Sequence, residues 1–221
     1  MSCADSSQCL LQIRVGSVQE YSEARISGGS DTWTSAIRKS PIVGSVTVTF
    51  LGIEGDEHAD TLNHGGPEKA ILCYAREHYA SWSQELGPNA PPPGTLGENF
   101  EIGGASEDEI CIGDTFEVGG IVVQVSQPRQ PCWKPALLHD FAQLTAQILK
   151  TGRTGWYLRV LQGGIVNAPA PVRLLERPHP DWTVARATRV MHFQKDGGLR
   201  AELAGVPALS AAWKAKLLGE H

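Results

Sequence analysis

Cys132 has the most unusual setting for its residue type, in the segment SQPRQPCWKP at 126–135. A cysteine in a globular protein is most often a small buried apolar side chain. Here three prolines fix an extended or turned backbone, and Arg129 and Lys134 lower the free-energy cost of forming a thiolate. Because a thiolate is both a nucleophile and a soft metal ligand, this loop predicts chemistry at Cys132.

A second segment, HGGPEK, combines an imidazole and an ammonium with two glycines. Gly65 and Gly66 separate His64 from Lys69 and would let the backbone approach a ligand closely with its amides exposed. This composition suits an anion, although HGG also occurs in ordinary turns.

Two further segments carry polar side chains next to glycine. GENF supplies Glu98 and Asn99 before a predicted strand, where an Asx turn with a solvated glutamate explains the pattern equally well. RTGW supplies Arg153 and Gly155 after a predicted helix. Helix termination accounts for the glycine but not for the arginine.

The composition excludes several classes of protein. The 221 residues are 41% hydrophobic and 19% charged, as in ordinary globular proteins, and the net charge of −5 provides no basic field for a nucleic-acid polymer. No apolar run approaches the roughly 20 residues that span a bilayer, and the first residues lack the pattern of a secretory signal. We therefore expect a cytoplasmic protein that does not bind membranes.

The five cysteines are odd in number, widely spaced and without a CxxC pair. This pattern argues against a disulfide framework and against a four-thiolate zinc site. Cys73 and Cys111 have apolar neighbours and are expected to be buried, whereas Cys3 and Cys9 are close to the beginning of the chain.

The elements that must position these residues are predicted to be short strands, because glycine and proline are abundant. Strands or extended segments are expected at 12–15, 34–38, 43–50, 70–74, 99–102, 115–118, 121–125, 156–161 and 172–175. Helices are expected at 77–86 and 136–149, and then at 183–191, 199–203 and 210–218. The chain thus divides into a mainly β domain at 1–177 and a small helical segment at 178–221, joined by a proline-containing linker.

Seven segments in this order resemble one known family: GIEGDEHAD (52–60), HGGPEKA (64–70), YAREHY (74–79), GENF (97–100), IGDTFEVG (112–119), VSQPRQPCWK (125–134) and TGRTGWYLRV (151–160). The chain resembles MOSC domains, the C-terminal fold of molybdenum-cofactor sulfurases. More narrowly it is similar to the bacterial YiiM proteins, which carry a MOSC domain and a C-terminal three-helix segment. The resemblance covers about residues 10–218.

The resemblance implies a β-barrel-like domain that binds a molybdenum–pyranopterin cofactor, with Cys132 as the metal ligand. A thiolate suits molybdenum, and the pterin dithiolene and oxo or hydroxo groups would complete its coordination. The remaining cofactor-binding candidates are Arg129, Lys69 and Arg153 for the phosphate, His64, Gly65 and Gly66 for an anion or the pterin, and Glu98, Asn99 and Gln127 around the pterin or substrate.

The resemblance also implies reduction of N-hydroxylated compounds, including N-hydroxylated purine bases, and so a role in their detoxification. His64 and Glu98 are the candidate proton donors, on the ground of titratability alone. The sequence has no flavin or nicotinamide fingerprint, no iron–sulfur run and no haem motif, and pyridoxal phosphate is not expected. Electrons would therefore come from a separate protein, a flavoprotein reductase. A homodimer is compatible with the sequence.

Two other functions remain open at this point. The chain could carry molybdenum cofactor or persulfide sulfur on Cys132 without turning over a substrate, as MOSC domains in sulfurases suggest. Alternatively, Cys132 could act as a nucleophile in acyl or thiol transfer with His139 as its base, although nothing in the sequence orients that histidine.

Overall fold

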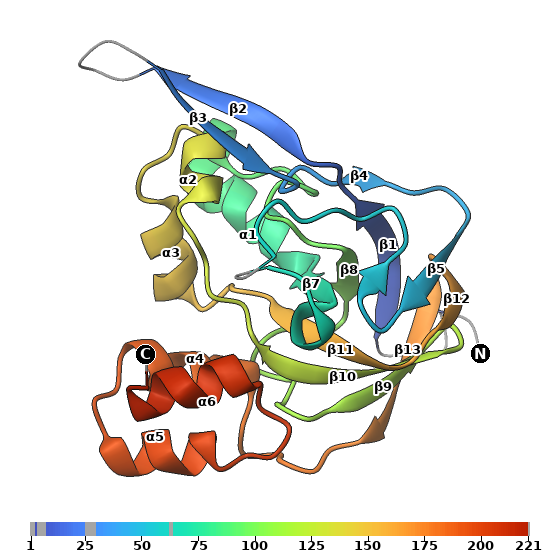
Figure 1. The fold of residues 1–221 in the computed structure, drawn as a ribbon, viewed down its shortest axis with the longest axis vertical. Helices are drawn as coiled ribbons and strands as arrows, with labels where there is room; N and C mark the ends of the chain where they lie inside the picture. The colour runs from blue at the N-terminus through green and yellow to red at the C-terminus, as the bar shows by residue number, and fades with distance from the viewer. Residues whose placement is uncertain (1–2, 4–7, 25–29, 62–63, 221) are drawn as a thin grey trace.

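The protein is mainly β, as predicted, with a barrel of seven strands and helices at one side and at the C-terminal end (Figure 1). The computed structural model describes residue 3 and residues 8–24, 30–61 and 64–220. The strands are β1 (Cys9–Val15), β2 (Gln19–Ala24), β3 (Ser30–Ser35), β4 (Ser40–Pro41), β5 (Ser45–Thr49), β6 (Gly52–Ile53), β7 (Ile71–Ala75), β8 (Phe100–Gly103), β9 (Thr115–Val118), β10 (Ile121–Pro128), β11 (Trp156–Gln162), β12 (Gly164–Asn167) and β13 (Ala170–Glu176).

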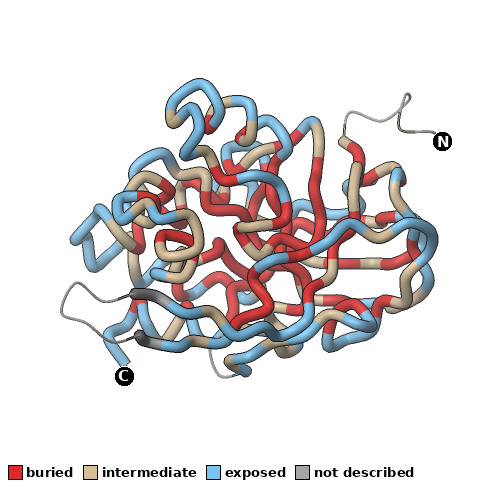
Figure 2. Tube along the Cα trace, turned by 90° about the horizontal axis from the view of Figure 1, so that it is seen from above, coloured by how far each residue is buried: buried red, intermediate tan, exposed pale blue. Residues whose placement is uncertain are grey.

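The barrel follows the order β13-β9-β10-β11-β7-β8-β1 and closes where β1 pairs with β13. Neighbouring strands are antiparallel except β7 and β8, which are parallel. In β10 the alternating residues Ile121, Val123 and Val125 are fully buried and point into the barrel, while β7 is buried along its whole length. Figure 2 shows that the buried residues are concentrated in the interior of the molecule.

Two small sheets flank the barrel. Strands β12, β5 and β6 form one, and the β2–β3 hairpin forms the other. The hairpin projects beyond the body of the protein next to α2 (Figure 1). Strand β12 was not predicted from the sequence, because its glycine-rich start and four-residue length give little periodicity.

The helices are α1 (Glu77–Leu86), α2 (Lys134–Leu138), α3 (Leu144–Thr151), α4 (Val184–His192), α5 (Gly197–Ala204) and α6 (Ala211–Leu218), with short 3-10 turns η1 (Pro67–Lys69) and η2 (Gly87–Asn89). The predicted helix at 77–86 is confirmed. The single helix predicted at 136–149 is wrong, because Asp140 adopts φ 48° and separates α2 from α3. The loop predicted to start at Ser126 starts later, since β10 continues through Pro128.

The three predicted C-terminal helices are present and pack directly on the barrel. Their N-caps are Thr183, Asp196 and Ser210, each of which accepts a backbone N–H of the first turn. One buried apolar cluster includes barrel residues such as Val123 together with Trp213 of α6. The division at residue 177 stays a prediction.

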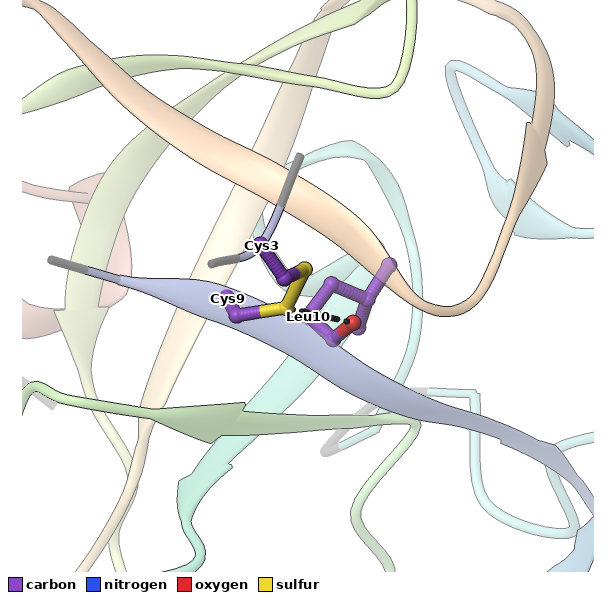
Figure 3. Close-up of a disulfide and its surroundings, with 3 residues drawn as sticks. All are labelled: Cys3, Cys9 and Leu10. Atoms are coloured by element: carbon purple, nitrogen blue, oxygen red, sulfur yellow. Dashed lines mark hydrogen bonds between the residues drawn. A yellow bond between two sulfur atoms is a disulfide. The ribbon is translucent and has the colours of Figure 1, made fainter. Parts of the chain in front are cut away.

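A disulfide joins Cys3 to Cys9 at the start of β1 (Figure 3). The expectation that the cysteines form no disulfide is therefore wrong for this pair. An odd number of cysteines means only that not all of them can form disulfides. The remaining three, Cys73, Cys111 and Cys132, are free thiols. Within the described ranges, no helix is both long and apolar enough to cross a bilayer.

Candidate active site

The free thiol of Cys132 lines a cavity near the C-terminal end of β10. The cavity is partly open to solvent, and its volume accessible to the centre of a water molecule is about 70 Å³. Thr145 of α3 donates a hydrogen bond to the Cys132 carbonyl oxygen at 3.0 Å, and Arg129 N–H donates to the Gly155 carbonyl oxygen at 3.0 Å. The loop that carries the thiol is thus fixed from two sides.

Six of the predicted site residues line this Cys132 cavity, namely His64, Gly65, Lys69, Asn99, Arg129 and Cys132. An adjoining outer depression shares Cys132, His64 and Lys69 with the cavity and adds Gln127 and Trp133. The structure therefore brings together the segments HGGPEK and PRQPC, which are about 60 residues apart in the chain.

Several positive side chains line the Cys132 cavity. Arg129 is only 5% exposed and its Nη2 donates to the Leu96 carbonyl oxygen at 2.8 Å, while its buried Nη1 has no hydrogen-bond partner among the described residues. Lys69 and Lys134 also line the cavity, and burial lowers the pKa of Lys69. A buried guanidinium with an unused donor is a binding position for an anionic group.

His64 is electrically neutral in this setting. Burial, together with the neighbouring Lys134, Arg129 and Lys69, lowers its pKa to about 4, although Asp60 opposes the shift. Its Nδ1 lies 3.7 Å from an Asp60 carboxylate oxygen. At neutral pH the side chain can therefore donate a hydrogen bond through its one ring N–H, but it is not the imidazolium that a general acid would need.

The two glycines of HGGPEK differ in their surroundings. Both have positive φ, 75° for Gly65 and 79° for Gly66, which few other residues adopt. A Cβ atom on Gly65 would lie 3.0 Å from the His58 ring, whereas a Cβ on Gly66 would meet nothing within 4 Å. Gly65 lines the cavity, and Gly66 precedes the 3-10 turn that positions Lys69.

Two cavity residues, Lys39 and Asn99, belong to a buried network of which only Asn99 was predicted from the sequence. Lys39 pairs with Asp56, whose carboxylate also accepts Gly16 N–H at 2.8 Å and Asn99 Nδ2 at 2.9 Å. His58 Nε2 lies 3.8 Å from Asp56. The segment GDEHAD gave no signal of this network, because acidic side chains in a polar loop are mostly exposed.

Glu98 is fully buried but does not line the Cys132 cavity or the outer depression. Its carboxylate accepts hydrogen bonds from the Gly94 N–H, the Leu96 N–H and the Tyr79 hydroxyl. Burial and the adjacent Glu98 raise the pKa of Tyr79. The described contacts of Glu98 thus hold the Pro93–Gly97 turn in place, and the structure does not bring this residue to the thiol.

Arg153 is also outside the cavity. Its guanidinium forms two hydrogen bonds with Glu85, at 2.8 and 2.7 Å, and lies 4.7 Å from the centre of the Trp82 ring. The side chain therefore joins the loop before β11 to α1. His139, the candidate base, ends α2 and is not among the cavity residues.

The C-terminal helices are bonded to the segment that carries Cys132. The Ser210 hydroxyl donates to Gln127 Oε1 at 2.7 Å, and Ser210 N–H donates to the Ser126 carbonyl oxygen at 3.0 Å. Lys216 Nζ donates to Gln130 Oε1 at 3.1 Å. Gln127 thus has a structural partner while it lines the outer depression.

Comparison with known proteins agrees with this geometry. The family model described as "MOSC domain" matches residues 60–173, the region that holds HGGPEK, PRQPC and TGRTGW. The chain belongs to the MOSC domain family. In the described residues of this MOSC protein, no group of three or more His, Cys, Asp or Glu side chains is placed to hold a metal ion.

Relatives of the MOSC protein cover most of its length. It is 36% identical over 215 residues to "Uncharacterized protein YflK" of Bacillus subtilis, covering 95% of this chain and 92% of the relative. It is 37% identical over 188 residues to a protein named "Reductase" from Gibberella moniliformis, covering 82% of this chain but only 32% of that longer protein. The crystal structure of YiiM from Geobacillus stearothermophilus superimposes with a TM-score of 0.78 at 32% identity, covering 96% of this chain and 98% of the other.

Proposed function

We propose that this MOSC protein is a molybdenum-cofactor-dependent reductase of N-hydroxylated compounds, among them N-hydroxylated purine bases, that receives electrons from a separate flavoprotein reductase. The observation that carries the proposal is a free thiol on a fixed loop, at a cavity where the buried Arg129 has an unused donor. The name of the Gibberella relative, "Reductase", supports the redox part of the proposal.

The side chains present fit such a cofactor. Cys132 offers a soft sulfur donor to the metal, and it is the only thiol among the described residues that line the cavity. The unused Nη1 of Arg129 and the ammonium of Lys69 are suited to a phosphate group, because a guanidinium can bind it in a bidentate manner. When bound, the cofactor supplies the two-electron redox chemistry.

The chain itself would bind and orient the reactants. Neutral His64 offers a hydrogen bond to a polar substrate group, and its lowered pKa argues against it as the acid at neutral pH. Asp56 is bonded to Lys39 and Asn99, two residues that line the cavity, and these bonds help the cavity to keep its shape. A proton for the departing oxygen would then come from solvent or from another group at the cavity.

An activity assay tests the proposal. Protein from a cofactor-competent host is mixed with N-hydroxyadenine and a flavoprotein electron donor, and formation of adenine is followed. We expect turnover by the wild type and loss of turnover in Cys132→Ser, but not in Cys111→Ser. Cys111 is a free cysteine outside the cavity whose thiol donates to the Pro180 carbonyl oxygen, a bond that serine can keep. A molybdenum-loaded protein that reduces no N-hydroxylated compound with any of several donors would instead support a cofactor carrier.

A further inference from the structure

Trp133 is a large aromatic side chain that remains 52% exposed directly beside the candidate active site. It follows Cys132 in the chain and lines the outer depression together with Cys132, His64 and Tyr157. Since an exposed indole ring leaves apolar surface in water, its place at the mouth of a cavity calls for a partner.

The orientation of Trp133 is fixed by the β2–β3 hairpin. Its ring meets Trp33 edge to face, with ring centres 5.5 Å apart and an angle of 71°. Trp33 in turn stacks on Tyr21 at 4.3 Å, and these two residues are cross-strand partners in the hairpin. Lys134 Nζ lies 5.9 Å from the Trp133 ring centre and donates to the Thr34 carbonyl oxygen at 3.1 Å.

This aromatic row, Tyr21, Trp33 and Trp133, does not belong to either buried apolar cluster of the described residues. The packing of these three rings therefore supports Trp133 at the outer depression and is not part of the apolar core. A ring that is already held in one orientation loses little side-chain entropy when a ligand binds on it.

We propose that Trp133 provides a stacking face for the planar ring of the substrate and so selects N-hydroxylated heteroaromatic bases over aliphatic hydroxylamines. This inference rests on the proposed function. Aromatic side chains stack on every nucleobase because each base has a π face, and the interaction changes affinity by about 5- to 150-fold. Because Trp133 and Cys132 line the same depression, a base on this ring lies beside the proposed metal ligand.

The test measures binding separately from turnover. Equilibrium dialysis gives the dissociation constant of adenine, a planar base without a reducible N–OH group, for cofactor-loaded protein. The variants are Trp133→Leu, which removes the ring but keeps an apolar side chain, and Trp133→Phe, which keeps a ring. Trp33→Leu, which removes the support, is a second variant if Trp133→Leu does not fold. Phe50→Ala is the matched control, because Phe50 is 62% exposed and lines neither the Cys132 cavity nor the outer depression.

We expect Trp133→Leu to bind adenine at least about fivefold more weakly, Trp133→Phe to recover most of the affinity, and Phe50→Ala to match the wild type. The kcat/KM for N-methylhydroxylamine should change less than about twofold in Trp133→Leu at equal molybdenum content. The kcat/KM for N-hydroxyadenine should fall by about the same factor as the affinity for adenine.

Three results would overturn the inference. The first is a dissociation constant of adenine that Trp133→Leu leaves unchanged. The second is an equal loss of kcat/KM for the aliphatic and the heteroaromatic substrate. The third is a change confined to the KM for the electron-donor protein. If the wild type binds adenine through Trp133 but reduces no N-hydroxylated compound, the proposed function fails while the stacking face stands. If it reduces hydroxylamines but binds no base, the stacking face fails alone.

Discussion

The close approach of β11 and β7 at Gly155 makes a sharp prediction about stability. Gly152 and Gly155 belong to one segment, TGRTG, and both have φ +75°. A Cβ atom on Gly155 would lie 2.5 Å from the Cys73 carbonyl oxygen and 3.1 Å from Tyr74 Cδ2, whereas a Cβ on Gly152 would meet nothing within 4 Å. The pair Gly155→Ala and Gly152→Ala therefore separates crowding from backbone strain.

The magnitudes follow from these two contributions. The left-handed backbone costs an alanine about 1 kcal/mol at either position, and the lower entropy of the unfolded chain returns about 0.5 kcal/mol. Gly152→Ala should then lower the free energy of unfolding by about 0.5 kcal/mol. At Gly155 the contact with a backbone oxygen adds about 1–3 kcal/mol, because the paired strands must move apart. We expect a total loss of about 1.5–3.5 kcal/mol.

Urea denaturation measures both variants, with the loss appearing as a lower midpoint at an unchanged slope. The Gly155 N–H donates to Glu107 at 2.6 Å and its carbonyl oxygen accepts from Arg129, so displacement of this residue should also lower molybdenum content. Equal midpoints for Gly155→Ala and Gly152→Ala would refute the reasoning.

Two further predictions concern His64 and Ser210. The pKa of His64 in the folded protein is about 4, below its ordinary value of 6.5, so between these pH values only the unfolded chain binds the proton. Wild-type stability should fall more steeply than that of His64→Gln as pH is lowered through this window in urea titrations, and equal slopes would contradict the shift. Ser210→Ala removes both the cap of α6 and the partner of Gln127, and should cost about 2–3 kcal/mol and part of the bound molybdenum. Asp196→Ala removes only the cap of α5 and should cost about 1 kcal/mol with full loading; identical effects would argue against a positioning role for Ser210.

Local patterns in the sequence predicted much of the fold. The helix predicted at 77–86 matches α1, and the strands predicted at 115–118 and 121–125 match β9 and most of β10, which turn into one another at Gly119-Gly120. The split between α2 and α3 could not be predicted, because it depends on the left-handed backbone of Asp140 in an otherwise helical pattern. Closure of the barrel through β1 and β13 is a contact between the two ends of the domain, which no local pattern encodes.

The sequence predicted which loops meet at the cavity, but not which of the other polar side chains line it. Cys132, Arg129 and His64 meet at one cavity, as the motifs indicated. Glu98 and Arg153 come from equally polar segments, yet their side chains satisfy backbone amides and Glu85 instead. Their partners are set by tertiary packing, so residue type and spacing alone could not distinguish them from the cavity residues.

The most direct measurement of the central claim is the molybdenum and pterin content of protein purified from a cofactor-competent host. The account predicts about one molybdenum and one pterin per chain in the wild type and in Cys111→Ser, and loss of molybdenum in Cys132→Ser. Wild-type protein that contains neither molybdenum nor pterin, or a Cys132→Ser variant that keeps its full molybdenum content, would contradict it.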